Sequence, residues 1–241
     1  MTMKKVDSRP FHFKQFSLYH HRSTMKVGTD SVLLGVWTRL QGVCDALDIG
    51  TGSGILSLLL AARSQCKVDA VELDQPSYEE AKANFEASPF SDQLRAHHAD
   101  FNTFAAQAGQ RYDLIISNPP FFINDRKPEN QHKRIARHAE TLTYEQLIEG
   151  SIGLLNPSGM LSLVLPYREG LRFMSIANEK GLFVQRQLLI FPKPCVPPNR
   201  INLQLGLEEK PLEKQKFIIR NESGDFTEQY RSFLKDFYLS I

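Results

Sequence analysis

The 241-residue sequence predicts a doubly wound α/β domain with a mostly parallel sheet and helices on both faces. Three features lead to this prediction. Residues 114–116 form a short apolar run, as expected for a strand that is buried on both faces. Residues 50–54 form a glycine-rich turn between a predicted strand and a predicted helix. Strand-like and helix-like segments alternate along most of the chain, which is typical of βαβ units.

The composition is that of a globular protein, with 41% hydrophobic and 23% charged residues. No apolar run approaches the roughly eighteen residues of a membrane span, and residues 1–10 are polar. We therefore expect a cytoplasmic protein with no signal peptide and no membrane anchor. The 3 cysteines form no C-x-x-C pair, so we expect neither a metal site nor a disulfide framework.

Residues 1–40 are expected to be an extension packed on a core domain of residues 41–241. The aromatic residues of its first half alternate in part with polar ones, which indicates a strand or hairpin. Thr29 or Asp30 can cap the helix that follows. Gly28 beside that cap lets a ligand approach the backbone, although a plain helix start explains the same residues.

The glycine-rich turn at 50–54 is the first indication of a ligand. Glycine allows the tight reversal from strand to helix and lets a ligand touch the backbone without meeting a Cβ. A dinucleotide site would require a small residue where this chain has Ile55. The turn therefore favours a nucleoside without a pyrophosphate, close to the backbone of Gly50 and Gly52. Asp48 would help to position that ligand, although a helix-cap or turn residue is the alternative.

Two further acids follow the next predicted strands. Glu72 lies about twenty residues after the first glycine, near the end of the strand 68–74, where an acid can accept both ribose hydroxyls. Asp74 is expected to begin the next helix. Asp100 ends a short strand at 95–100 and is either an acceptor for a base amino group or a solvated loop acid. The residues themselves leave these two alternatives open.

The buried run at 114–116 ends abruptly in Asn118-Pro119-Pro120-Phe121, followed by Phe122. The prolines have no N–H to give to a sheet and fix their own φ. Oδ1 of Asn118 and the carbonyl of Pro119 could therefore accept both hydrogens of a flat NH2 group, while Phe121 or Phe122 stacks on its ring. A strand-ending turn explains the tetrapeptide about equally well.

Charge is unevenly distributed, although the formal net charge is only +2. Residues 4–26 and 126–138 are each strongly basic, and the second segment directly follows the Asn-Pro-Pro-Phe tetrapeptide. A single charged run is usually a solvated face. Two of them, one beside a candidate site, favour the phosphate contacts that dominate nucleic-acid affinity. Residues 124–138 are accordingly expected to form a mobile loop that orders on substrate.

The remaining segments continue the alternation of strands and helices. Thr143 and Gln146 resemble a capping box that opens a helix, and residues 156–159 are expected to turn that helix into the next strand. The segment Pro192–Arg200 carries four prolines and is either an RNA contact or a structural connector. The other expected elements are helices at 55–63, at 171–180 and after Thr227, and strands at 160–165, 183–191, 201–207 and 217–220.

Several of these motifs resemble a known family. Asn118–Phe121 resembles the Asn-Pro-Pro-Tyr/Phe motif of S-adenosylmethionine-dependent amino-group methyltransferases, and Asp48–Gly54 is similar to their cofactor loop. Met25–Gly35, together with Ala136–Arg137 and Thr141–Leu142, resembles the bacterial valine-tRNA adenine-N6 methyltransferases. The resemblance runs from near the N-terminus to the C-terminus and is weakest around the basic loop and the proline-rich link.

The resemblance implies a Rossmann-like class I S-adenosylmethionine-dependent methyltransferase with a mostly parallel, seven-stranded sheet. It implies methylation of adenine N6 in tRNA, at the anticodon-loop adenine 3′ of the anticodon in tRNA(Val). We expect the enzyme to be cytoplasmic and monomeric and to bind neither a metal nor a membrane. The tRNA identity and the target position come from the resemblance alone.

The same resemblance also implies which residues of this chain form the site. The catalytic residues would be Asn118, Pro119 and Phe121. The cofactor would contact Lys26, Gly28, Thr29, Asp48, Gly50, Gly52, Glu72, Leu73, Asp100, Phe101 and Asn118. Here Asp100 would accept from the amino group of the cofactor adenine, and Phe101 could lie on its ring. RNA would contact Phe122, Arg126, Lys133, Arg134 and Arg137.

Other functions remain alternatives at this stage. The same chemistry could act on guanine N2 in ribosomal RNA, adenine in DNA or a protein glutamine. The glutamine enzymes usually carry a larger N-terminal domain, and the DNA enzymes a target-recognition domain, neither of which is evident here. A non-catalytic protein that binds S-adenosylmethionine or RNA is disfavoured because Asp48, Glu72 and Asn118 are all present. A nicotinamide dehydrogenase fits the glycine turn poorly.

Overall fold

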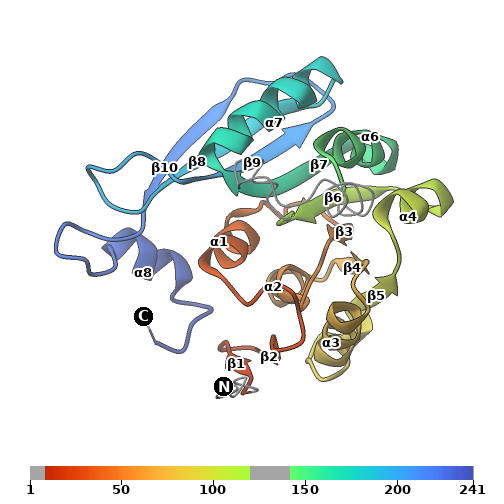
Figure 1. Cartoon of the computed structure of the whole chain (residues 1–241), viewed down its shortest axis with the longest axis horizontal. Coiled ribbons are helices and arrows are strands. Elements are labelled where there is room, and N and C mark those ends of the chain that lie inside the picture. The colour runs from red at the N-terminus through yellow and green to blue at the C-terminus, as the bar shows by residue number, and fades with distance from the viewer. Residues whose placement is uncertain (1–8, 120–141, 241) are drawn as a thin grey trace, which may run out of the picture.

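The computed structural model of the chain describes residues 9–119 and 142–240. A central sheet of eight strands is covered by helices on both faces (Figure 1). In sheet order the strands are β10 (Glu213–Ile218), β8 (Phe183–Phe191), β9 (Arg200–Gly206), β7 (Leu155–Pro166), β6 (Tyr112–Ser117), β3 (Asp45–Ile49), β4 (Lys67–Glu72) and β5 (Leu94–His98).

The sheet is mostly parallel, as the sequence predicted. Only β9 runs against its neighbours, since it is antiparallel to both β7 and β8. The sheet has eight strands rather than the predicted seven, because β10 adds a parallel strand beside β8 at the edge. The chain passes from β3 outward to β4 and β5 and then returns to β6 on the other side of β3. The carboxyl ends of β3 and β6 therefore meet at a topological switch point, where open α/β sheets bind ligands.

The helices divide between the two faces of the sheet, each with its own apolar core (Figure 1). One core packs against α1 (Thr29–Trp37), α2 (Ile55–Arg63), α3 (Gln75–Glu86) and α8 (Glu228–Leu234). The other core packs against α4 (Phe101–Gln107), α6 (Tyr144–Leu154) and α7 (Tyr167–Glu179). A short 3-10 helix spans Ser91–Gln93. Within the described ranges, no helix has the length and apolar character needed to cross a membrane.

The N-terminal segment shares the first of these cores. It forms a two-stranded antiparallel sheet of β1 (Phe11–His12) and β2 (Ser17–Leu18), which confirms the expected hairpin. The buried carboxylate of Glu80 on α3 then accepts hydrogen bonds from three consecutive backbone N–H groups, at distances of 2.8–2.9 Å, from residues 21–23. This contact ties the chain leading into α1 to the main domain. A boundary at residue 40 stays a prediction.

Local signals predicted some helix starts correctly and others not. Thr143 and Gln146 form the expected capping box of α6, and Asp74 caps α3. The cap expected at Thr29 or Asp30 is wrong, because α1 begins after Gly28 without a side-chain cap. The turn expected at 156–159 is also wrong, because β7 already begins at Leu155 and pairs there with β6.

Candidate functional site

The site lies where β3, β4 and β6 end side by side. We call this row of C-terminal strand ends the carboxyl edge of the sheet. In the register of the sheet, Ile49 at the end of β3 pairs with Val71 of β4 and with Ser117 of β6. A hydrogen bond of 2.8 Å from Oγ of Ser117 to the carbonyl of Ile49 further ties β6 to β3. The residues that follow these three positions therefore lie in one row along the edge: Gly50, Glu72 and Asn118.

The glycine turn leaves open space above its backbone. Gly50 and Gly52 adopt positive φ values of 68° and 57°, and a Cβ built on either would meet nothing within 4 Å. Gly54 differs, because a Cβ there would lie 2.4 Å from the ring of Phe85 on α3. Gly54 is thus needed for packing inside the protein, whereas Gly50 and Gly52 present bare backbone to a ligand.

Asp48 lies fully buried beneath this turn. Its Oδ2 accepts hydrogen bonds from Oγ1 of Thr51 at 2.6 Å and from Oγ and N of Ser57 at 2.7 and 3.2 Å. Its Oδ1 is buried and has no hydrogen-bond partner among the described residues. Burial raises the pKa of Asp48 to about 6, and the hydrogen bonds from Thr51 and Ser57 partly oppose this rise. One oxygen therefore holds the turn, as in the helix-cap alternative, and the other is an unused acceptor.

Glu72 sits at the end of β4 and supports the same turn. Its carboxylate accepts from N of Gly52 at 2.8 Å and from N of Asp74 at 2.9 Å. A carboxylate has about four acceptor positions, so two remain for hydroxyl groups. Next to it, the side chain of Leu73 is 49% exposed and offers an apolar surface. An acid with spare acceptors beside an exposed apolar side chain suits a nucleoside.

Asp100 and Phe101 are placed at the start of α4. Oδ1 of Asp100 accepts from N of Thr103 at 3.0 Å, so this residue caps a helix that the sequence did not predict. Phe101 is only 5% exposed and belongs to the core between α4 and α6, where a Cβ at Gly150 would lie 2.5 Å from its ring. Contact of Asp100 and Phe101 with an adenine ring stays a prediction.

Asn118 is the polar residue at the switch point itself. Its Nδ2 donates a hydrogen bond of 2.8 Å to Oγ of Ser31 on α1. Its Oδ1 is buried and, within residues 9–119 and 142–240, has no hydrogen-bond partner. The next residue, Pro119, is also buried. Sequence reasoning did not single out Ser31, although this serine lies inside the Met25–Gly35 motif.

The contact with Ser31 brings the start of α1 to the site, and with it Lys26, Gly28 and Thr29. Lys26 and Gly28 are exposed. The first backbone N–H groups of a helix have no partner within the helix, and no side chain caps those of α1. The positive end of the helix dipole and Lys26 together favour a negatively charged group here, such as a carboxylate.

The remaining predicted site residues lie outside the described residues. They are Phe121 of the tetrapeptide and the expected RNA contacts Phe122, Arg126, Lys133, Arg134 and Arg137. Among the residues that the structure does describe, there is no group of three or more His, Cys, Asp or Glu side chains that could hold a metal ion.

Comparison with known proteins first defines the class. The family model of the Methyltransferase small domain matches residues 23–174. The crystal structure of a predicted O-methyltransferase from Agrobacterium tumefaciens is similar, with a TM-score of 0.66 and 21% identity over 86% of this chain and 96% of that one. A T. thermophilus 16S rRNA N2 G1207 methyltransferase, solved with AdoMet and guanosine, gives a TM-score of 0.56 at 21% identity over 83% and 50%. The fold is that of class I S-adenosylmethionine-dependent methyltransferases, as expected.

Sequence relatives then define the particular family. The tRNA1(Val) (adenine(37)-N6)-methyltransferase of Trichodesmium erythraeum is 40% identical over 232 residues, which is 95% of this chain and 97% of that protein. The protein of the same name from Proteus mirabilis is also 40% identical, over 95% of this chain and 93% of that protein. The chain belongs to the tRNA1(Val) (adenine(37)-N6)-methyltransferase family, which confirms the resemblance found in its sequence motifs.

Proposed function

We propose that the protein transfers a methyl group from S-adenosylmethionine to N6 of adenine 37 in tRNA1(Val). Its relatives carry this name over nearly the whole length of both chains. The observation in the structure that supports the proposal is Oδ1 of Asn118 at the switch point of the sheet, which is buried and has no hydrogen-bond partner among the described residues. It is an acceptor placed where an amino group can meet a cofactor.

The residues at the carboxyl edge fit S-adenosylmethionine, which would supply an activated methyl group. Glu72 keeps acceptor positions for two ribose hydroxyls, and the exposed side chain of Leu73 would be covered by the adenine. Oδ1 of Asp48, which no group of the described chain contacts by a hydrogen bond, and the open backbone of Gly50 and Gly52 suit the ammonium end of the methionine part. The start of α1 and the exposed Lys26 just before it suit the carboxylate.

The catalytic work of the chain is to hold the target nitrogen and stabilise its developing charge. An exocyclic amino group is a poor nucleophile, because its lone pair is delocalised into the ring. Positive charge builds on this nitrogen as it attacks the methyl group, and Oδ1 of Asn118 with the carbonyl of Pro119 would accept its two hydrogens. Positioning and preorganised electrostatics would then provide most of the rate enhancement. No general base is required, since the product cation loses its proton easily.

The substrate base must leave its stack to reach this edge of the sheet. The tRNA partner is part of the proposal, as is action in the cytoplasm by a monomer. The monomeric state is an expectation from the sequence. Size-exclusion chromatography with light scattering tests it directly, and a stable dimer would contradict it.

The function is tested with transcripts of tRNA1(Val) and labelled S-adenosylmethionine, followed by nucleoside analysis. We expect N6-methyladenosine in the transcript with adenine at position 37, and none in a matched transcript with guanine there. Label that appears instead in guanine of ribosomal RNA, in DNA or in protein would support the corresponding alternative acceptor. No label in any tRNA would contradict the proposal.

A further inference from the structure

Helix α1 contacts the central sheet through two hydroxyl groups, one near each end of the helix. Oγ of Ser31 accepts from Nδ2 of Asn118 on the β6 side, at 2.8 Å. Oγ1 of Thr38, just after α1, lies 2.8 Å from Oγ of Ser162 on β7 and donates to the carbonyl of Leu34, also at 2.8 Å. Ser31, Thr38 and Ser162 are all buried. The two contacts are therefore equal in distance, and each uses a buried hydroxyl group at one end of α1.

The two contacts differ in what they leave unpaired. Both hydroxyl groups of the Thr38 contact have partners. The Ser31 contact uses only the nitrogen side of the Asn118 amide, and leaves Oδ1 buried with no partner in the described part of the chain. An unpaired buried acceptor is unfavourable, and a donor that enters the site removes this penalty. Such an arrangement suits the recognition of an N–H group from outside the protein.

The side of the amide that faces the site decides whether an amino group can bind. A terminal amide carries two donors on its nitrogen and an acceptor on its oxygen, and a half-turn of the side chain exchanges them. With Nδ2 held by Ser31, Oδ1 is the atom left for a ligand. In the reverse orientation, Nδ2 would meet the N–H groups of the target base, and donor would face donor.

The position of Ser31 is itself fixed by contacts of α1 with distant parts of the chain. Its neighbour Asp30 forms an ion pair with Arg200 at the start of β9, with 2.7 Å between Oδ2 and Nε. At the other end of the helix, Arg63 of α2 donates to the carbonyl of Thr38 at 3.0 Å. The hydroxyl group of Ser31 thus has a defined place next to β6.

We propose that Ser31 is a positioning residue for methyl transfer, which holds the Asn118 amide with its oxygen toward the target amino group. The inference rests on the proposed function and adds a residue to it. Ser31 does not touch the reacting atoms and acts only through Asn118. Its loss should lower the rate of the chemical step and leave the binding of the cofactor and of RNA nearly unchanged.

The experiment compares Ser31→Ala with Ser162→Ala, a matched control that removes the same kind of hydroxyl contact from the other end of the helix. Steady-state methylation gives kcat and KM for tRNA, and equilibrium dialysis gives Kd for S-adenosylmethionine. For Ser31→Ala we expect kcat to fall by roughly tenfold or more, with KM and Kd within about twofold of the unchanged protein. For Ser162→Ala all three should stay within about twofold. Thermal melts of both variants verify that each is folded.

Two results would overturn the positioning role. One is a kcat of folded Ser31→Ala that stays close to that of the unchanged protein. The other is an equal fall of kcat in both variants, which would assign the effect to the packing of α1 in general. Absence of tRNA methylation by the unchanged protein would instead refute the proposed function. The two failures are therefore distinguishable.

Discussion

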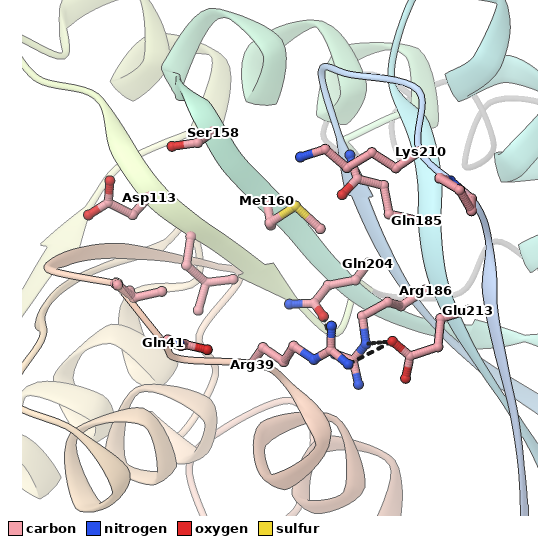
Figure 2. A pocket seen from close by; sticks show the side chains of 14 residues that line it. Arg39, Gln41, Asp113, Ser158, Met160, Gln185, Arg186, Gln204, Lys210 and Glu213 are labelled. Atoms are coloured by element: carbon pink, nitrogen blue, oxygen red, sulfur yellow. Dashed lines mark hydrogen bonds and ion pairs between the residues drawn. The ribbon is translucent and has the colours of Figure 1, made fainter.

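The amino edge of the central sheet, where the parallel strands begin, and its carboxyl edge, where they end, differ in how their polar groups are paired. At the amino edge, a pocket of about 460 Å³ opens near the starts of β6, β7, β8 and β10 (Figure 2). Its charged groups are largely paired: Glu213 lies 2.6 Å from Arg39 and 3.3 Å from Arg186, although Nε of Arg186 makes no hydrogen bond within the described residues. The guanidinium of Arg186 also lies 4.5 Å from the centre of the Trp37 ring. This edge is a hollow lined in part by ion-paired side chains.

At the carboxyl edge, the polar groups are not paired with one another in this way. Oδ1 of Asn118 and Oδ1 of Asp48 are both buried without a partner in the described residues, and Leu73 is exposed beside the acceptors of Glu72. Buried polar groups in proteins are nearly always paired, so an unpaired one calls for a ligand or a function. Unpaired buried atoms also occur elsewhere among the described residues, at Ser151, Arg186 and Asn202. What distinguishes the carboxyl edge is that its unpaired oxygens lie beside the open glycine backbone and the acceptors of Glu72. The size of a hollow does not mark it.

The strongest test of this difference is Asn118→Ala. Removing the acceptor should lower kcat by about 100- to 1000-fold, since loss of one preorganised hydrogen-bonding group typically has an effect of this order. Binding of S-adenosylmethionine should be nearly intact, because the other expected cofactor contacts, Asp48 and Glu72 among them, remain in place. Single-turnover methylation and isothermal titration calorimetry measure the two quantities. Turnover near that of the unchanged protein would remove Asn118 from the mechanism.

The second test concerns the cofactor side of the same edge. Glu72→Ala removes the expected ribose acceptor and the support that Gly52 and Asp74 receive from it. We expect the Kd of S-adenosylmethionine to rise roughly 10- to 100-fold, as for the loss of charged hydrogen bonds worth about 1.5–3 kcal/mol. Calorimetric titration measures it, with Glu79→Ala on the exposed side of α3 as a control. An unchanged Kd would mean that the cofactor does not use this acid.

The third test uses the raised pKa of Asp48. Burial raises its pKa in the folded protein to about 6 from an ordinary 3.8, so the native state binds this proton more tightly than the unfolded state. Protonated Asp48 therefore contributes stability that is fully present below about pH 4 and is lost as the pH rises through 6. A shift of this size corresponds to about 3 kcal/mol at most.

Asp48→Asn, which keeps the shape without the charge, should lose this pH dependence. Urea denaturation of the unchanged and substituted proteins between pH 4 and pH 7 gives the free energies of unfolding to compare. Their difference should change across this range in favour of the asparagine variant as the pH rises. Two parallel stability curves would show that Asp48 does not titrate there.

The smallest effect is expected at the amino edge. Glu213→Gln removes the ion pairs with Arg39 and Arg186, and should lower the free energy of unfolding by about 1 kcal/mol, because Glu213 is partly exposed to solvent. Activity and the Kd of S-adenosylmethionine should stay within about twofold of those of the unchanged protein. Urea denaturation and the tRNA methylation assay measure these quantities. A large loss of activity would show that both edges take part in function.

The sequence predicted most of the fold because many of its signals are local. The capping box at Thr143 and the cap at Asp74 are set by residues three positions apart, and both were confirmed. The start of β7 at Leu155 was missed because it depends on pairing with β6. Helix α4 was missed because it is short and has a single buried side chain, Phe101.

The candidate site was predicted as a set of positions, but not as a set of contacts. The glycine turn, Glu72 and Asn118 do meet at one edge, as expected from the order of strands and turns. The hydrogen bond between Ser31 and Asn118 joins residues 87 positions apart, and no local pattern encodes it. Nor could the sequence show that one oxygen of Asp48 is taken up by Thr51 and Ser57.

The anchoring of residues 21–23 by Glu80 has a practical consequence for anyone who trims the protein. Residues 1–40 resemble an appendage, yet they deliver Ser31 and the start of α1 to the end of β6. A recombinant fragment that began at residue 41 would keep the glycine turn and the asparagine but lose one wall of the site. For protein production or engineering, the minimal unit of this enzyme therefore includes its N-terminal segment.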